Sequence, residues 1–347
     1  MRVRKLGVVG AGTMGGGIAA LAASAGVPVV LLDVPGQEKR NEPAEAGLGR
    51  QVKSKPAAFM DTDRAALVQT GNTEDHLHLL ADCDWIVEAI IEQPAPKQAL
   101  FARLEEIAKP TAIVASNTSG IPMHVLTEGR SERFKRNFLG THFFSPVRYM
   151  HLLELIPTSE TAPETTAAIV EFAERALGKG TVIAKDAPGF IANRLGVKGM
   201  FSTMRQMEAN GLTIDEVDAL TGPLIGRPGS ATFRTGDISG IDVLQHVSKG
   251  LAESTGEDFS LPAWVGGMVE RKQLGDKTGG GFYQKRGKEI FTFDYRTGEY
   301  APQQKPEDAA LKAAGKLPLA ERVKAALALP GNYGQFVRRM MLEGAHY

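Results

Sequence analysis

The chain of 347 residues is long enough for two domains with their own cores. Hydrophobic residues make up 43% of it, and 40 acidic residues balance 40 basic ones, which gives no electrostatic case for binding nucleic acid or an anionic membrane. No apolar stretch is long enough to predict a membrane span. The single cysteine, Cys83, excludes a disulfide within the chain and a cysteine zinc site, so we expect no metal and a reducing, by default cytoplasmic, compartment.

Short apolar runs alternate with helical segments through the first half of the chain. Strands are expected at residues 5–10, 28–33, 85–91, 112–116 and 182–184. Helical composition and spacing mark residues 14–25 and 100–107. Strands that alternate with helices predict an α/β fold built on a doubly wound parallel sheet.

Residues 35–72 do not fit a simple connection between a strand and a helix, because they are long, polar and broken by prolines and glycines. They contain a basic cluster of Arg50, Lys53 and Lys55. Two interpretations stay open for this insert: a solvated loop with short helices, or an arm over the active site that meets substrate phosphates. Lys53 and Lys55 are candidate substrate-binding residues on the ground of charge alone.

Near Asp186 the pattern changes from alternating strands to helices, with helical segments at residues 190–210 and 214–220. We therefore expect a cofactor domain over residues 1–185 and a smaller all-helical domain over residues 186–285. Residues 286–347 are expected to form a hairpin around residues 292–300 and a helical extension.

A G-x-G-x-x-G string, GAGTMG, follows the first predicted strand and opens the first predicted helix, and Asp33 ends the second strand. In a Rossmann-like domain the first glycine permits the turn, the second lets the backbone approach a pyrophosphate, and the third lets helix and strand pack closely. Asp33 can accept hydrogen bonds from ribose hydroxyls and would repel a 2′-phosphate. The pattern predicts an NAD site at Gly10, Gly12, Thr13, Met14, Gly15 and Asp33.

Oxidation of an alcohol by such a cofactor requires a base for the hydroxyl proton, and histidine suits this because its pKa lies near neutrality. Of the seven histidines, His142 lies between apolar runs, and Glu154 follows in the second run. Position alone explains His142 equally well as a buried core histidine.

The segment around His142, THFFSPVRYMHLLELI, resembles the signature of the 3-hydroxyacyl-CoA dehydrogenases. SNTSG, VEAIIE, DAPGFIANR, GRPGSATFRT and KTGGGFY are similar to further motifs of that family, in the same order, from residue 3 to about residue 283. The likeness is closest to the bacterial fatty-acid oxidation enzymes. One departure is Ser145, where the family usually has asparagine after HFF; this puts the contact at that position in doubt but not the reaction.

The resemblance implies NAD-dependent oxidation of (S)-3-hydroxyacyl-CoA to 3-oxoacyl-CoA in fatty-acid β-oxidation. His142 would be the general base and Glu154 would hold its imidazole in the useful tautomer. Ser119 would hydrogen-bond the reacting oxygen and Asn193 would contact the substrate nearby. Without the resemblance, Ser119 could close a serine turn and Asn193 could cap one.

The same resemblance implies further cofactor contacts. Glu92 and Lys97 would contact the nicotinamide ribose side of NAD, together with Ser119, and Lys277 of the KTGGGFY segment would approach the cofactor. Lys97 is equally compatible with a solvated position on a helix.

Two competing functions remain: a dehydrogenase of another small hydroxy acid on the same fold, and a non-catalytic binding or structural protein. For assembly we expect either a homodimer through residues after Asp186 or one piece of a longer chain. Residues 331–347 predict a helix with Phe336, Met340 and Met341 on one side, and the sequence offers nothing obvious to cover that side. The alternative is a frayed terminal helix packed on its own domain.

Asp33 generates a testable expectation about cofactor choice. Its carboxylate favours ribose hydroxyls over a phosphate, so kcat/KM with NAD should clearly exceed kcat/KM with NADP. Replacing Asp33 by a neutral residue should narrow the difference. Equal efficiency with both cofactors in the unaltered protein would contradict the assignment.

Overall fold

The computed structural model describes residues 3–347, and the chain divides into two compact units, Met1–Ile191 and Ala192–Tyr347. Each unit has its own hydrophobic core. Within residues 3–347, no helix combines the length and apolarity needed to cross a bilayer.

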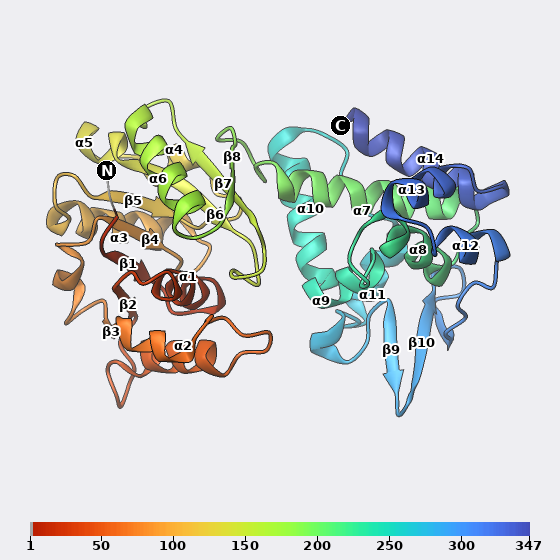
Figure 1. The fold of residues 1–347 in the computed structure, drawn as a ribbon, viewed down its shortest axis with the longest axis horizontal. Coiled ribbons are helices and arrows are strands. Elements are labelled where there is room, and N and C mark those ends of the chain that lie inside the picture. The colour runs from red at the N-terminus through yellow and green to blue at the C-terminus, as the bar shows by residue number, and fades with distance from the viewer. Residues whose placement is uncertain (1–2) are drawn as a thin grey trace. The chain divides into compact units, whose positions relative to one another are not determined.

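The first unit is built on an eight-stranded sheet of order β3-β2-β1-β4-β5-β6-β7-β8 (Figure 1). Its pairs are parallel except for β6 with β7, which is antiparallel. The strands are β1 Leu6–Val9, β2 Val29–Asp33, β3 Val68–Asn72, β4 Trp85–Glu88, β5 Ile113–Ser116, β6 Phe138–Phe143, β7 Leu152–Pro157 and β8 Gly180–Ile183. All five strands expected from the sequence are present.

Helices cover both faces of this sheet, which confirms the predicted doubly wound arrangement. They are α1 Thr13–Ser24, α2 Glu42–Lys53, α3 Pro94–Ile107, α4 Met123–Leu126, α5 Glu132–Arg136 and α6 Pro163–Arg175. Successive side chains of β4 alternate between two cores: Trp85 and Val87 join the core that contains α1 and α6, whereas Ile86 joins the core that contains α3. The continuous apolar runs of the sequence follow from burial on both faces.

The insert at residues 35–72 contains more regular structure than a solvated loop with short helices. It contains α2 and a 3₁₀ helix over Thr62–Leu67, and it ends in β3, which pairs in parallel with β2. The prediction of a loop with short helices therefore missed a strand. β3 lies at the edge of the sheet, and its sequence VQTGN carries only two residues with a strong strand preference.

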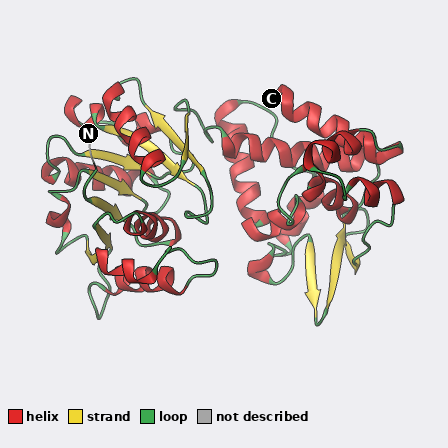
Figure 2. Ribbon diagram, in the orientation of Figure 1, coloured by secondary structure: helices red, strands yellow, loops and turns green. Residues whose placement is uncertain are grey.

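The second unit is mainly helical, and its described strands form one small antiparallel sheet (Figure 2). The strands are β9 Tyr283–Arg286, β10 Glu289–Asp294 and β11 Glu299–Pro302. The helices are α7 Ala192–Ala209, α8 Ile214–Thr221, α9 Phe233–Ser239, α10 Ile241–Thr255, α11 Ala263–Glu270, α12 Ala309–Ala314, α13 Leu319–Leu327 and α14 Gly331–His346. The hairpin expected at residues 292–300 is present as β10 and β11, and β9 extends it.

The apolar side of the last helix, for which the sequence offered no obvious cover, is packed against its own unit, as in the alternative of a terminal helix packed on its own domain. α14 packs along α7, and Phe336, Val337 and Met340 are buried in the core of the second unit. Glu343 of α14 also accepts a hydrogen bond of 2.6 Å from Gln206 of α7. The covering surface could not be identified from the sequence because α7 lies more than a hundred residues earlier in the chain.

The burial of α14 leads to a stability prediction. Phe336 is fully buried, so Phe336→Ala should lower the free energy of unfolding by about 3–5 kcal/mol, the usual cost of removing a buried aromatic ring. Leu342→Ala on the same helix is the matched control, because Leu342 is 58% exposed. Chemical denaturation measures both, and an equal loss in the two variants would contradict the packing described here.

Candidate active site

Five residues mark the carboxyl edge of the first unit's sheet. Gly10 follows β1, Asp33 ends β2, Glu88 ends β4, Ser116 ends β5, and His142 lies next to the end of β6. These strands run parallel, so their carboxyl ends meet at one edge. In open α/β sheets that edge is where ligands bind.

The glycine loop has the shape that a pyrophosphate requires. A Cβ on Gly10, whose φ is +103°, would lie 2.4 Å from the carbonyl oxygen of Ala89. A Cβ on Gly15 would lie 1.8 Å from the carbonyl oxygen of Gly10, so both positions exclude a side chain. Gly12 faces open space, and α1 begins immediately after it at Thr13. The backbone is therefore accessible at the positive end of the helix dipole, which fits the phosphates of a dinucleotide.

The carboxylate of Asp33 is held against the same loop. Its Oδ2 accepts a hydrogen bond of 2.8 Å from the amide of Ala11, and its Oδ1 accepts one of 2.7 Å from the amide of Val34. Each oxygen keeps a second lone pair for a ribose hydroxyl. Asp33 is half-buried, and these two hydrogen bonds hold its carboxylate in position at the end of the second strand.

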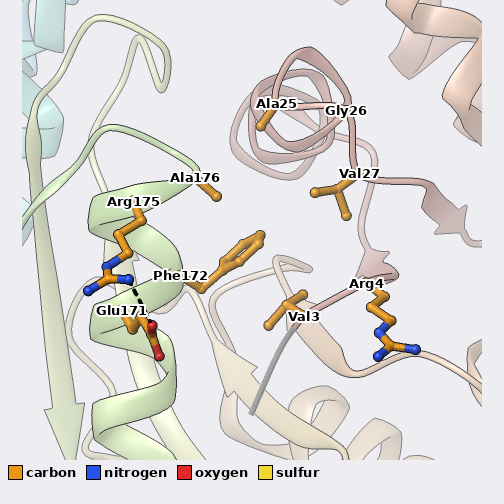
Figure 3. A pocket seen from close by; sticks show the side chains of 9 residues that line it. All are labelled: Val3, Arg4, Ala25, Gly26, Val27, Glu171, Phe172, Arg175 and Ala176. Carbon is orange, nitrogen blue, oxygen red and sulfur yellow. Dashed lines mark ion pairs between the residues drawn. The ribbon is translucent and has the colours of Figure 1, made fainter.

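A hollow of about 820 Å³ lies at the opposite edge of this sheet (Figure 3). Its walls come from the segment before β1, the turn between α1 and β2, and the end of α6, including Val3, Val27 and Phe172. Arg175 at its rim pairs with Glu171 at 3.4 Å. Since these are the amino ends of the strands, the hollow is separate from the glycine loop.

His142 and Glu154 form a buried pair. They lie directly opposite each other across the antiparallel strands β6 and β7, and Nδ1 of His142 lies 2.7 Å from Oε2 of Glu154. His142 is 4% exposed and Glu154 is 1% exposed. An ionised carboxylate only accepts hydrogen bonds, so this contact suits an imidazole that carries its proton on Nδ1. The second oxygen of Glu154 accepts a 3.1 Å hydrogen bond from the amide of Ile191.

A second buried ionic cluster lies at the ends of β4 and β5. Nζ of Lys97, on α3, lies 2.6 Å from Oε1 of Glu88 and 3.3 Å from Oε2 of Glu92. Oε2 of Glu88 accepts a 2.5 Å hydrogen bond from Ser116. Lys97 and Glu88 are both almost completely inaccessible, whereas the side chain of Glu92 is 46% exposed. Lys97 is therefore a buried counter-ion, and Glu92 carries the accessible charge of the cluster.

The loop after β5 connects this cluster to the strand that carries His142. Oε1 of Glu92 accepts hydrogen bonds from the hydroxyl of Thr118 and, at 2.7 Å, from the amide of Ser119. Asn117 accepts a 2.9 Å hydrogen bond from the amide of Phe143, the residue after His142. The exposed Ser119 is thus held by its backbone at the same edge as His142.

Comparison with known proteins identifies the family. The profile described as "3-hydroxyacyl-CoA dehydrogenase, NAD binding domain" matches residues 5–187, and "3-hydroxyacyl-CoA dehydrogenase, C-terminal domain" matches residues 189–285. The chain belongs to the 3-hydroxyacyl-CoA dehydrogenase family. It is an enzyme of that family with an NAD-binding domain, as the sequence motifs predicted.

Relatives differ in how much of their length this 3-hydroxyacyl-CoA dehydrogenase spans. A Deinococcus radiodurans protein named "Probable 3-hydroxyacyl-CoA dehydrogenase" is 53% identical over 289 residues, 82% of this chain and 84% of the relative. A Bacillus subtilis protein of the same name is 42% identical over 332 residues, 90% of this chain but only 42% of the relative. The crystal structure of M. tuberculosis FadB2 is 34% identical with a TM-score of 0.71, and the match covers 82% of this chain and all of that one.

Two residues that the family resemblance singled out belong to the second unit, and the two lysines chosen by charge belong to the first. Asn193, near the start of α7, and Lys277, which pairs with Asp242, belong to the second unit. Lys53 is exposed at the end of α2, and Lys55 lines a pocket of about 290 Å³ in the first unit.

Glu88, Asn117 and Thr118 are parts of this dehydrogenase's site that the sequence did not single out. All three lie inside motifs that carried the resemblance, VEAIIE and SNTSG. A lone acid at the end of the apolar run WIVE is the signal that could have identified Glu88, because buried acids need a charged or hydrogen-bonding partner.

The Glu88–Lys97 pair generates a stability prediction. Glu88→Gln should lower the free energy of unfolding by about 3–5 kcal/mol, because it removes the nearer partner of a buried lysine. Glu106→Gln on α3 is the control, since Glu106 is exposed. Adding Lys97→Met to Glu88→Gln should restore part of the loss in urea denaturation. No recovery in the double variant would contradict a direct interaction between the two charges.

Proposed function

We propose that the chain oxidises the 3-hydroxyl group of (S)-3-hydroxyacyl-CoA to the 3-oxo group in fatty-acid β-oxidation, with His142 as general base and Glu154 as its partner. The observation that carries this proposal is the buried 2.7 Å contact between Nδ1 of His142 and Glu154. It lies at the same sheet edge as the glycine loop. Membership of the family supplies the substrate class.

The tautomer of His142 suits the role of base. With the proton on Nδ1 and directed at Glu154, Nε2 carries a lone pair that can accept the hydroxyl proton of the substrate. The negative charge of Glu154 then stabilises the imidazolium that forms, as in other oriented histidine bases. The ring centroids of Phe144 and Phe190 lie 4.4 and 5.6 Å from the centroid of the imidazole, so both rings pack beside it and limit its movement.

The cofactor would be held by Gly10, Gly12 and Gly15 at its phosphates and by Asp33 at its ribose. Bound NAD supplies the acceptor for the hydride that leaves the carbon bearing the hydroxyl group. We propose that Glu92 is the accessible contact on the nicotinamide side and that Lys97 orients Glu92 from behind. For three further residues we propose the roles that the family resemblance implies. Ser119 would hydrogen-bond the reacting oxygen, Asn193 would contact the substrate, and Lys277 would approach the cofactor.

The coenzyme A moiety carries phosphates, and a basic pocket beside α1 offers a place for them. Gly17 of α1, Arg50 and Lys55 of the insert, and Ser145 all line the pocket of about 290 Å³. Arg148 joins its wall and donates a 2.7 Å hydrogen bond to the carbonyl of Phe59, so the segment after Ser145 is tied to the insert. Lys53 is exposed on the same helix as Arg50 and would add charge at the entrance.

For assembly we propose a homodimer through the second unit, or incorporation of this chain into a longer protein. Leu195, Ile238 and Val243 of that unit are 47%, 60% and 47% exposed, which is unusual for large apolar side chains and favours an interface. The match to only 42% of the Bacillus subtilis relative supports the second possibility. A cytoplasmic location stays a prediction from the single cysteine.

Replacement of His142 tests the catalytic proposal. His142→Gln should lower kcat by roughly 10²- to 10⁴-fold, the usual contribution of a positioned acid–base group. NADH absorbance with 3-hydroxyacyl-CoA substrates of several chain lengths measures the rate. NAD binding measured by calorimetry should be unchanged, since the glycine loop is untouched.

His151→Gln is the matched control, because His151 lies in the same sequence segment but is exposed and contacts the carbonyl of Gly178. It should retain near-normal kcat. Turnover of His142→Gln close to that of the control would remove His142 from the mechanism. Oxidation of free hydroxy acids but not of acyl-CoA substrates would instead overturn the proposed substrate.

A further inference from the structure

Arg40 forms a forked ion pair on the surface of the first unit. Its Nε lies 2.6 Å from Oδ2 of Asp75, and its Nη2 lies 2.8 Å from Oδ1 of Asp75 and 2.9 Å from Oε2 of Glu74. Two parallel hydrogen bonds to one carboxylate are the strongest geometry available to an arginine. We call Arg40, Glu74 and Asp75 the arginine clamp.

Asn72 builds the acidic half of the clamp. This residue ends β3, is fully buried, and its Oδ1 accepts hydrogen bonds of 3.0 and 2.8 Å from the amides of Glu74 and Asp75. Its Nδ2 donates to Oδ2 of Asp75 at 2.9 Å and to Oδ1 of Asn41 at 2.7 Å. Asn72 therefore holds Glu74 and Asp75 in an ordered turn. This turn positions both carboxylates for their pairing with Arg40.

The clamp lies close to the predicted ribose site. The carbonyl of Asp33 accepts a 2.9 Å hydrogen bond from the amide of Thr73, the residue before Glu74. On the other side, the carbonyl of Arg40 accepts a 3.0 Å hydrogen bond from the amide of Gly36, three residues after Asp33. Both halves of the clamp are thus connected to the end of β2 through short hydrogen-bonded turns.

An arginine near the end of β2 has a known chemical use in dinucleotide sites, because its guanidinium binds the 2′-phosphate of NADP. Here the guanidinium is already occupied by two carboxylates. Hydrogen bonds from Arg40 and then from Asn72 lower the pKa of Asp75 to about 2, so that Asp75 is ionised at neutral pH. The side chain of Arg40 is nevertheless 51% exposed, so only its acidic partners restrain it.

We propose that the arginine clamp is a second determinant of cofactor specificity, in which Glu74 and Asp75 withhold Arg40 from the 2′-phosphate of NADP. Asp33 disfavours NADP by repulsion, and the clamp disfavours it by withholding the guanidinium that the loop after β2 supplies. This inference rests on the role proposed for Asp33. It predicts that a variant with Asp33 neutralised binds NADP less tightly than a variant in which Glu74 and Asp75 are neutralised as well.

Cofactor binding by calorimetry at low ionic strength tests the clamp without relying on turnover. The reference is Asp33→Asn, and the test variant adds Glu74→Gln and Asp75→Asn to it. A matched control adds Glu38→Gln and Glu42→Gln instead, which neutralise two exposed acids on either side of Arg40 in the sequence but leave the clamp intact. A fourth protein adds Arg40→Ala to the test variant. Thermal unfolding midpoints verify that each variant is folded.

Release of Arg40 should tighten the Kd of NADP at least about tenfold relative to both the reference and the control, as expected for one hydrogen bond to a charged group. Adding Arg40→Ala should abolish that gain. Relative to the Asp33→Asn reference, the Kd of NAD should change little, because NAD lacks the 2′-phosphate. If the test variant does not fold, Asp33→Asn with Glu74→Gln alone leaves the Asn72 turn unaltered and should give a smaller gain of the same sign.

Two results would overturn the proposal: equal NADP affinity in the test variant and the control, or a gain that persists after Arg40→Ala. Failure of Asp33→Asn to improve NADP binding over the unaltered protein would instead refute the proposed role of Asp33. The comparison between test variant and control would still decide the role of the clamp, so the two failures are distinguishable.

Discussion

The antiparallel pairing of β6 with β7 is the constraint on which the candidate active site depends. β6 runs parallel to β5, and this brings His142 to the sheet edge where the glycine loop lies. The reversal into β7 then sets Glu154 opposite His142 on the same face. A shift of one residue in this register would turn Glu154 to the other face of the sheet and leave the histidine without its carboxylate.

The parts of the fold that sequence could predict are those in which one short stretch carries the whole signal. The run PVVLL before Asp33 is apolar throughout because β2 is covered on both faces, and the glycine string marks the turn into α1 without further information. β3 and the burial of α14 could not be predicted, because the residues that stabilise each element lie in another part of the chain. The edge strand VQTGN is stabilised by β2 rather than by its own composition, and α14 is buried by α7 from a distant part of the chain.

The same distinction applies to the site. Asp33 and the glycines could be located from spacing, whereas His142 and Glu154 needed the family resemblance, since a buried histidine in an apolar run has two explanations. The ionic cluster of Glu88, Lys97 and Glu92 depends on α3 folding back over β4, which no local pattern encodes. Lys97 is the buried member and Glu92 the accessible one, so the alternative of Lys97 as a solvated helix residue is wrong.

Glu154 uses its two oxygens for two different partners, and this limits how its replacement can be interpreted. Oε1 accepts the amide of Ile191, the last residue of the first unit, while Oε2 faces the imidazole. A glutamine in its place would keep a carbonyl oxygen for Ile191 and turn its NH₂ group toward Nδ1. That group donates a hydrogen bond, so Nδ1 would have to accept it and the ring proton would move to Nε2. The isosteric change would therefore place a proton on Nε2, the atom whose lone pair the proposed mechanism uses to accept the hydroxyl proton.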